Sequence, residues 1–288
     1  MLNEALNQIS DREDINTSAK MVHNTMKPHS IENLHDQNYQ KISKKIEKFL
    51  SSYISKSPAK GLVIGLSGGL DSSVVLRLSV NAVGSSKVLG LVMPSDTTPS
   101  MDTDHAINLA KKLRIKYRVI DIRPVIRKFE EILPPPDKRA RGNLMARIRM
   151  ILLYYHAGIN GYIVVGTSDK SELKIGYFSK FGDGAADIMP IADLYKTQVR
   201  SLARYLDIPT AIVEKKSSPR FWDNHLAEEE LGMDYETIDQ ILHMLVDKKA
   251  NLKDVTRKLG VSTSHVHKVK SMIEKSSHKR GPAAIFQL

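Results

Sequence analysis

A short glycine-containing turn holds the residues whose types and spacing best suit chemistry. It reads Ser67-Gly68-Gly69-Leu70-Asp71-Ser72-Ser73 and follows the apolar run at 61–66. Glycines let backbone N–H groups approach phosphate oxygens, small hydroxyls can donate to them, and a helix N-terminus favours negative charge. Asp71 would repel a bound anion unless a hard cation such as Mg²⁺ bridged its carboxylate to the phosphate. The turn therefore predicts a site that binds phosphate together with Mg²⁺.

This turn is not a Walker A loop, because Leu70 and Asp71 follow its last glycine where a Walker A loop has Lys and then Ser or Thr. It resembles the Ser-Gly-Gly-x-Asp-Ser pyrophosphate loop of the ATP pyrophosphatase superfamily. The resemblance implies an enzyme that cleaves ATP between the α and β phosphates and transfers AMP to an acceptor oxygen. A tight turn that only connects a strand to a helix is the alternative.

Alternating strands and helices are expected to position the turn. Apolar runs predict strands at 61–66, 87–93, 117–122 and 162–166. Apolar residues at helical spacing predict helices at 39–56, 103–113 and 142–155, and a helix start at 74–78. The alternation predicts an α/β fold, a doubly wound parallel sheet with helices on both faces. Because ligands of such sheets bind at the carboxyl ends of the strands, Ser67 and Thr167 are expected to share one site.

The second half of the chain is expected to be mostly helical. A loop is expected from Thr167 to Ile191, and a stretch of this length without regular structure is commonly functional. The predicted helices after it are 196–206, 235–247, 252–259 and 262–275. Residues 1–38 are polar and lack periodicity, which predicts a loose extension. We therefore expect this extension and one catalytic domain, 39–288, whose residues 226–288 form a helical C-terminal extension.

Composition and charge narrow the class of protein. A hydrophobic content of 41% suits a globular domain, and no apolar run reaches the roughly 20 residues that a membrane helix needs. The N-terminus lacks a signal-peptide pattern, so we expect a cytoplasmic protein. The chain has no cysteine, which excludes disulfides, thiolate metal ligands and a cysteine nucleophile. The net charge of +11 is compatible with binding to nucleic acid, to an anionic membrane surface or to an anionic small substrate. The charge alone does not distinguish these three partners.

Longer strings downstream of the turn narrow the resemblance to one family. The strings are Gly142–Met150 (GNLMARIRM), Gly166–Glu172 (GTSDKSE), Gly176–Asp187 (GYFSKFGDGAAD) and Leu194–Arg200 (LYKTQVR). They resemble NAD synthetase from about residue 39 to 279, and the first 38 residues are not covered. The resemblance implies a fold like that of the adenine nucleotide alpha-hydrolases. It also implies an ammonia-dependent ligase: ATP adenylates the nicotinate carboxylate of deamido-NAD and releases pyrophosphate, and ammonia then displaces AMP to give NAD.

The resemblance also implies roles for individual residues. Asp71 and Glu172 would bind Mg²⁺, and Lys196 would neutralise phosphate. Asp187 would orient the nicotinate group or ammonia, and these four residues would carry the catalysis. The implied ATP site is Gly65, Leu66, Ser67, Gly68, Gly69, Leu70, Asp71, Ser72, Thr167, Lys196 and Ser218. The implied deamido-NAD site is Arg147, Lys180, Asp187, His278 and Lys279. Ordinary positions on a solvated helix or loop are the alternative for Arg147, Glu172 and Lys196.

The nitrogen donor and the oligomeric state are further expectations. Family members with a fused glutaminase domain use a cysteine nucleophile, and this chain has no cysteine, so free ammonia is the implied donor. The resemblance also implies a homodimer with the dinucleotide bound near the subunit boundary. The segment Trp222–Gly232 departs from the family's pattern, since His225 stands where bacterial relatives have glutamine and Ala227 where they have an acidic residue. The contacts made by that segment stay open.

Two other functions are compatible with parts of the sequence. A tRNA-modifying ATP pyrophosphatase of the lysidine synthetase type would explain the positive charge through phosphate contacts. Residues 254–269 also have the pattern of a DNA-binding helix-turn-helix, in which one helix ends at Leu259-Gly260-Val261 and Ser262 caps a basic second helix. Two packed helices of the enzyme are the alternative for that segment. We expect deamido-NAD, ATP and ammonia as partners, and neither nucleic acid nor a membrane.

Overall fold

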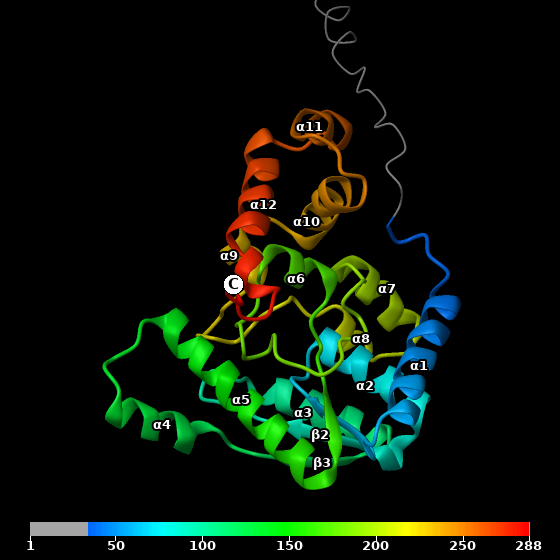
Figure 1. Ribbon diagram of the computed structural model, residues 1–288, viewed down its shortest axis with the longest axis vertical. Helices are drawn as coiled ribbons and strands as arrows, with labels where there is room; N and C mark the ends of the chain where they lie inside the picture. Colours follow the sequence, from blue (N-terminus) through cyan, green and yellow to red (C-terminus); the bar gives the residue numbers. More distant parts are fainter. Residues whose placement is uncertain (1–33, 288) are drawn as a thin grey trace, which may run out of the picture.

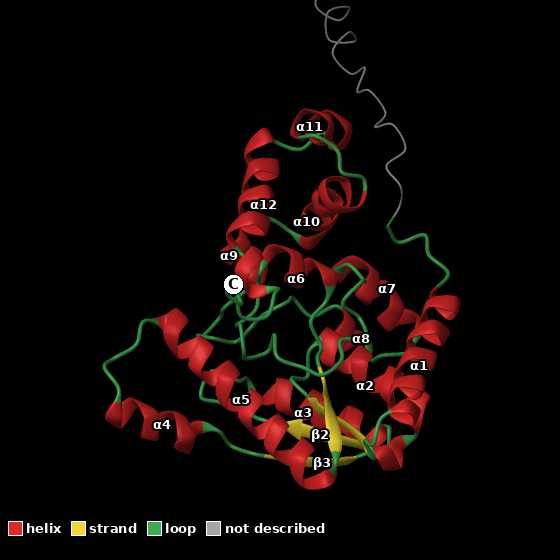
Figure 2. Ribbon diagram, viewed as in Figure 1, coloured by secondary structure: helices red, strands yellow, loops and turns green. Residues whose placement is uncertain are grey.

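The computed structural model describes residues 34–287. They form a four-stranded parallel sheet with helices packed around it (Figures 1 and 2). The strands are β1 Gly61–Gly65, β2 Val88–Val92, β3 Lys116–Val119 and β4 Tyr162–Val165. Their order is β3-β2-β1-β4, so β1 is an inner strand, with Leu62 opposite both Val88 and Ile163. Most of the expected N-terminal extension, residues 1–33, lies outside the described residues.

Helices connect the strands and form the rest of the chain. Those before β4 are α1 Tyr39–Lys56, α2 Leu70–Val83, α3 Ser100–Lys112, α4 Arg123–Ile132 and α5 Lys138–Asn160. Those after β4 are α6 Lys170–Ile175, α7 Lys196–Tyr205, α8 Thr210–Val213, α9 Ala227–Leu231, α10 Tyr235–Leu242, α11 Leu252–Leu259 and α12 Thr263–Lys275. The short segments are the 3₁₀ turns η1 Ser85–Lys87 and η3 Ser277–Lys279 and the π-helical η2 His243–Asp247. Within residues 34–287, no helix combines the length and the apolar character needed to cross a membrane.

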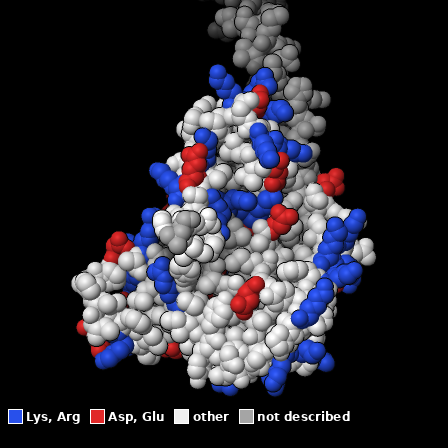
Figure 3. Space-filling view, viewed as in Figure 1, with Lys and Arg blue, Asp and Glu red and all other residues white. Residues whose placement is uncertain are grey.

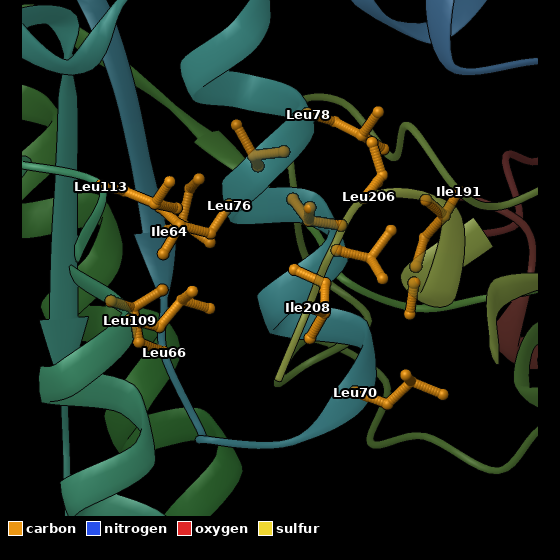
Figure 4. Packing of buried hydrophobic residues seen from close by; sticks show 14 of the residues in the cluster. Ile64, Leu66, Leu70, Leu76, Leu78, Leu109, Leu113, Ile191, Leu206 and Ile208 are labelled. Carbon is orange, nitrogen blue, oxygen red and sulfur yellow. The ribbon is translucent and has the colours of Figure 1, made fainter. Parts of the chain in front are cut away.

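One face of the sheet is covered by α1, α2, α3 and α7. Side chains alternate between the two faces of a strand, so Leu62 and Ile64 of β1 point to this layer. They belong to one buried cluster with Leu76 of α2 and Leu109 of α3, and Figure 4 shows Ile64, Leu76 and Leu109 side by side between strand and helices. Burying one such side chain contributes about 2 kcal/mol. This packing fixes α2 against β1, and the turn that connects them is fixed with it.

The other face of the sheet is covered by α4 and α5. Val63 of β1 points to this side and packs in a cluster with Ile126 of α4 and with Met145 and Ile148 of α5. All three strand pairs are parallel. Because helices cover both faces of a parallel sheet, the predicted doubly wound α/β fold is confirmed.

A further cluster of buried residues lies among the C-terminal helices, above the sheet in Figure 1. It contains Ile238 of α10, Val255 of α11 and Val266 of α12. Ile175 of α6 and Tyr195, which directly precedes α7, belong to the same cluster. The short helix α6 and the start of α7 therefore lie between the sheet layers and the C-terminal helices.

Some expectations about local structure need correction. They omit α4, although Pro124 in its first turn and Ile126 and Phe129 on one side of it are typical of an amphipathic helix. The expected loop at 167–191 contains α6, whose six residues are too few for apolar spacing to be recognised. The helix expected at 235–247 continues past α10 as the π-helical η2 rather than as one regular helix.

Candidate active site

A cleft of about 290 Å³ opens at the carboxyl ends of β1, β2 and β4. The turn after β1, the loop after β4 and the segment 215–221 line it. The predicted ATP-binding residues that line the cleft are Gly65, Leu66, Ser67, Gly69, Leu70, Asp71, Ser72, Thr167 and Ser218. Glu172 lines it as well, whereas Lys196 is buried beside it. The structure thus brings Ser67 and Thr167 to one cleft, as expected from the ends of their strands.

The turn between β1 and α2 has a backbone that requires glycine at position 68. Gly68 has a φ of +71°, and a Cβ there would lie 1.9 Å from the backbone oxygen of Asp102. The hydroxyl oxygens of Ser67 and Ser72 lie 3.0 Å apart within the turn. Because α2 begins at Leu70, the N–H groups of its first turn have no partner inside the helix. Such N–H groups are suited to bind phosphate oxygens.

Lys196 lies at the centre of three carboxylates. Its Nζ is 2.8 Å from Asp71 Oδ2, 2.9 Å from Asp169 Oδ2 and 2.8 Å from Glu172 Oε1. The lysine side chain is only 1% exposed. Burial by itself lowers the pKa of Lys196, but the three carboxylates outweigh burial and hold that pKa well above its ordinary value. The lysine is therefore charged, and it holds the acids of three different backbone positions together.

The start of α6 positions two of these acids. Asp169 is the N-cap residue, and its Oδ1 accepts the backbone N–H of Glu172 over 2.8 Å. The Glu172 side chain accepts the backbone N–H of Asp169 in return over 3.5 Å, which completes a capping box. Burial raises the pKa of both acids, and the charge of Lys196 opposes that rise. The capping box therefore orients Glu172 toward Lys196 and the cleft.

The donor set of this cluster fits a hard divalent cation. Asp71 Oδ1 is buried and has no hydrogen-bond partner among the described residues, so one ligand-type oxygen is unsatisfied. Carboxylate oxygens are the ligands that Mg²⁺ prefers, and Mg²⁺ completes its shell with substrate oxygens and water. Between residues 34 and 287, no three acidic or histidine side chains are already arranged around a single metal position. Lys196 Nζ lies between the carboxylates instead.

A second charged cluster supports the glycine turn from the other side. Lys215 Nζ donates to the backbone oxygen of Gly68 and to Asp102 Oδ1, each over 2.8 Å. Arg220 Nε donates to Asp102 Oδ2 over 2.9 Å. Lys215, Asp102 and Arg220 all line the cleft. They fix the position of Gly68 and add positive charge where a polyphosphate would lie.

Four of the five predicted dinucleotide-binding residues lie next to one another. Arg147 Nη2 donates to the backbone oxygen of Lys180 over 3.1 Å, and Lys180 Nζ donates to the backbone oxygen of His278 over 2.6 Å. Lys279 Nζ donates to two backbone oxygens of the same loop, those of Gly176 and Phe178. The group therefore joins α5, the loop after α6 and η3 into one basic surface.

Asp187 lies apart from this group. Its Oδ2 accepts the backbone N–H of Val164 over 2.7 Å, and its Oδ1 accepts from the hydroxyl of Tyr154 over 3.3 Å. Burial raises the pKa of Tyr154 to about 12, and the Asp187 carboxylate adds to that rise. Asp187 therefore lies at the edge of β4 beside α5, and none of its hydrogen bonds involves the other four predicted residues.

Comparison with known proteins decides the family of this chain. The family model for NAD synthase matches residues 42–283. The chain belongs to the NAD synthase family. The similar curated proteins include the NH(3)-dependent NAD(+) synthetase of Hyperthermus butylicus, which is 46% identical over 253 residues, covering 87% of this chain and 92% of that protein. The NH(3)-dependent NAD(+) synthetase of Staphylothermus marinus is 47% identical over 245 residues, covering 84% of this chain and 89% of that protein.

Solved structures of NAD synthase relatives share the fold described above. The NMN synthetase from Francisella tularensis superposes with a TM-score of 0.79 at 35% identity, covering 88% of this chain and 100% of that one. The NH3-dependent NAD synthetase from Campylobacter jejuni superposes with a TM-score of 0.75 at 29% identity, covering 87% of this chain and 100% of that one. The predicted resemblance to NAD synthetase is confirmed. The comparisons support neither the tRNA-modifying alternative nor the DNA-binding one.

The segment Trp222–Gly232, which departs from the NAD synthase pattern, is held in place by contacts of His225 and Glu230. The His225 ring stacks on Trp222 with centroids 3.4 Å apart, and its Nε2 lies 2.8 Å from Glu230 Oε2. Tyr177 and Arg139 also donate to the Glu230 carboxylate, over 2.8 and 3.0 Å. Burial lowers the pKa of His225, and Glu230 opposes that shift. The histidine thus anchors the segment beside Tyr177, which lines the cleft.

The sequence did not indicate every polar residue of this site. Asp169, Lys215 and Arg149 are absent from the predicted site, yet the first holds Lys196 and the other two line the cleft. Arg149 Nε donates to the backbone oxygen of Met93 over 3.1 Å, and burial lowers its pKa to about 10. For Asp169 a signal existed, since Asp followed three residues later by Glu is typical of a capping box. Lys215 and Arg149 depend on contacts between distant segments, which no local pattern shows.

Proposed function

We propose that this chain is an ammonia-dependent NAD synthetase that acts in the cytoplasm. ATP adenylates the nicotinate carboxylate of deamido-NAD, and ammonia then converts the adenylate to NAD. The observation that carries the proposal is the meeting of the glycine turn, Asp71 and Glu172 at one cleft of a chain from the NAD synthase family. The cleft supplies N–H donors for phosphate and carboxylates for Mg²⁺, which adenylation by ATP needs.

The turn at Ser67–Ser72 and the cations beside it would bind the polyphosphate. Asp71 and Glu172 would hold Mg²⁺, which when bound supplies positive charge to the phosphate oxygens. Lys196 Nζ lies within 3 Å of both acids, so its charge would act on the same side of the cleft as the Mg²⁺ that they would hold. The N-terminus of α2 adds its dipole on the same side.

Neither step of the proposed reaction forms a covalent bond between the substrate and the enzyme. A nicotinate carboxylate oxygen bonds to the α-phosphorus of ATP, the bond to the β-phosphate oxygen breaks, and pyrophosphate leaves. The acyl-adenylate carbon is then an electrophile, whereas the original carboxylate was not. Ammonia bonds to this carbon, the bond to the AMP oxygen breaks, and a proton is released. The protein's contribution is to position the reactants and to stabilise phosphate charge.

The dinucleotide would lie along the basic surface made by Arg147, Lys180, His278 and Lys279. Asp187 would orient the nicotinate group or ammonia from its place beside Tyr154. That place adjoins α5, which exposes Ile151, Tyr155 and Ile159 by 56%, 63% and 61%. Exposed apolar side chains at this spacing suit a subunit contact, so we propose a homodimer whose boundary runs along α5.

A second candidate is the same amidation on the mononucleotide, which would give NMN. It is favoured by the similarity to the NMN synthetase from Francisella tularensis, which is 35% identical to this chain. The two candidates share the adenylation chemistry and differ only in whether an adenylate half follows the nicotinate nucleotide. They are separated by comparing kcat/KM for deamido-NAD with kcat/KM for nicotinate mononucleotide.

Product analysis tests the proposed reaction. The full chain is incubated with ATP, Mg²⁺, deamido-NAD and ammonium, and the products are separated by liquid chromatography. We expect NAD, AMP and pyrophosphate in equal amounts. Formation of ADP and phosphate, or equal turnover with glutamine in place of ammonium, would contradict the proposal. A preference for the mononucleotide would favour the second candidate.

A further inference from the structure

Asp239 of α10 is a buried carboxylate that the proposed chemistry does not use. The residue is 0% exposed. Its Oδ1 accepts a hydrogen bond from Ser171 Oγ over 2.5 Å, and its Oδ2 accepts the backbone N–H of Thr197 over 2.9 Å. Ser171 Oγ in turn accepts the backbone N–H of Lys196 over 2.9 Å. Each oxygen of this one carboxylate therefore holds the start of a different helix, α6 or α7.

The two helix starts carry residues of the candidate active site. Ser171 directly precedes Glu172 in α6, and Thr197 directly follows Lys196 in α7. Glu172 Oε1 and Lys196 Nζ lie 2.8 Å apart. Asp239 thus fixes the separation of the two backbone positions from which these side chains extend. A shift of either helix start by an ångström would change where both charged groups lie.

Because burial raises the pKa of Asp239 to about 7, its side chain is ionised above about pH 7, and it then suits this task better than a neutral residue of similar size would. The first-turn N–H groups of α7 have no partner inside the helix, and Asp239 and Ser171 together accept two of them. A carboxylate offers two acceptor oxygens to donors on different segments, whereas a carboxamide offers only one. Burying a carboxylate is costly, and apolar packing of α10 against α6 and α7 would hold the helices together without it.

We propose that Asp239 is a positioning residue, which sets the spacing of Glu172 and Lys196 through Ser171 and Thr197 and thereby tunes the affinity for magnesium-bound ATP. The inference rests on the proposed function in so far as it takes Glu172 and Lys196 to bind that ligand. It assigns the C-terminal helices a role at the cleft, because α10 belongs to the cluster that packs α11 and α12 together.

Glu47 of α1 provides a matched control. It is 8% exposed, and its carboxylate accepts from Ser43 Oγ and from Asn81 Nδ2 of α2, each over 3.0 Å. It is thus another buried carboxylate that joins two helices. Neither Ser43 nor Asn81 adjoins a residue of the candidate active site. Its removal should lower stability without changing the spacing of Glu172 and Lys196.

The test is calorimetric binding of an ATP analogue with a methylene bridge between the α and β phosphates, in the presence of Mg²⁺. The full chain is compared with Asp239→Ala, Asp239→Asn, Ser171→Ala and Glu47→Ala. We expect Asp239→Ala and Ser171→Ala to weaken binding about 10- to 100-fold. Removing residues that orient metal ligands has an effect of this size on metal affinity in other proteins. Asp239→Asn keeps the shape of the side chain and one acceptor oxygen, so its affinity for the analogue should lie between those of the wild type and Asp239→Ala. Glu47→Ala should bind like the wild type although its thermal stability drops.

Two results would overturn the positioning role. One is wild-type affinity in folded Asp239→Ala and Ser171→Ala, and the other is an equal loss of affinity in Glu47→Ala. Should Asp239→Ala fail to fold, as judged by circular dichroism, Ser171→Ala decides alone. A wild-type chain that binds the analogue but forms no NAD would refute the proposed function, and the effect of the variants on binding would still stand.

Discussion

Asp71 and Glu172 come from distant segments and meet at Lys196. We expect Asp71→Ala and Glu172→Ala each to lower kcat/KM by at least about 100-fold, because each removes a proposed Mg²⁺ ligand. The remaining carboxylates still compensate Lys196, so circular dichroism should show a folded chain. Steady-state kinetics at saturating Mg²⁺ measures the effect. Glu131→Ala, an exposed acid of α4, is the control, and activity within a few-fold of wild type in the cleft variants would contradict the role.

Comparing Gly68 with Gly84 distinguishes two reasons for glycine: lack of room for a Cβ, and a backbone with positive φ. Both have positive φ, +71° and +82°, but a Cβ at Gly68 would lie 1.9 Å from a backbone oxygen, whereas nothing lies within 4 Å at Gly84. Gly84→Ala should cost only the conformational strain of φ +82° and ψ 152°, about 1–3 kcal/mol of unfolding free energy, and keep its affinity for ATP. Gly68→Ala should lose ATP binding, because the turn must move away from Asp102. Thermal unfolding and calorimetry test the pair, and equal behaviour of the two variants would refute the explanation.

Asp239 should make stability depend on pH. Burial raises the pKa of Asp239 to about 7 from an ordinary value of 3.8. Between these values the folded chain keeps a proton that the unfolded chain has released, so the contribution of this group is complete below about pH 4 and falls as the pH rises toward 7. The slope is at most about 1.4 kcal/mol per pH unit. Urea unfolding of Asp239→Asn between about pH 5 and 7 should show a smaller loss of stability than the wild type, and an identical loss would contradict the shift.

Some of these residues could be predicted from the sequence and others could not. Ser67 to Ser72 were identifiable because a local string of glycines, hydroxyls and one acid resembles a known loop, whereas the role of Glu172 was only implied by the resemblance of residues 166–172 to NAD synthetase. Asp239 is different, since it is a polar residue on an otherwise apolar helix face, and its role depends on two helix starts that lie far from it in the chain. Lys215 is similar, because its partners Gly68 and Asp102 come from other segments. Tertiary contacts of single polar residues leave no local pattern.

At the scale of elements, apolar runs predicted the strands well. β1 and β2 are buried along almost their whole length and β4 in its second half, so each appears as an uninterrupted apolar run and was found within a few residues. α6 was missed because polar capping by Asp169 and Glu172, rather than an apolar stripe, defines it. The same capping box points Glu172 at the cleft. One element that the apolar pattern missed therefore carries a proposed metal ligand.

At the scale of the whole molecule, some of the positive charge lies away from the cleft. Figure 3 shows Lys and Arg along α1 at the right edge of this face, and α1 contains Lys41, Lys44, Lys45 and Lys48. This helix covers the sheet layer of α2 and α7 and contributes no residue to the cleft. Part of the positive charge is thus carried by a helix that does not line the cleft, and the net charge of +11 therefore does not by itself identify the substrate.

An exposed apolar stripe on α5 concerns the assembly of the whole molecule. Ile151, Tyr155 and Ile159 are spaced four residues apart, so they lie on one side of the helix, and each is more than half exposed. We expect the double variant Ile151→Lys and Ile159→Lys to be monomeric, because charges would be buried in the proposed subunit contact. Light scattering after size exclusion measures the mass. Phe49→Lys on α1 is the control and should stay dimeric; a dimeric α5 variant would place the contact elsewhere.

Isotope transfer tests most directly whether the cleft activates a carboxylate with ATP. Deamido-NAD labelled with ¹⁸O in the nicotinate carboxylate is converted by the full chain with ATP, Mg²⁺ and ammonium, and the products are measured by mass spectrometry. Adenylation at the cleft predicts that AMP gains one ¹⁸O atom from the carboxylate and that pyrophosphate gains none. Unlabelled AMP, or ¹⁸O in pyrophosphate, would contradict it.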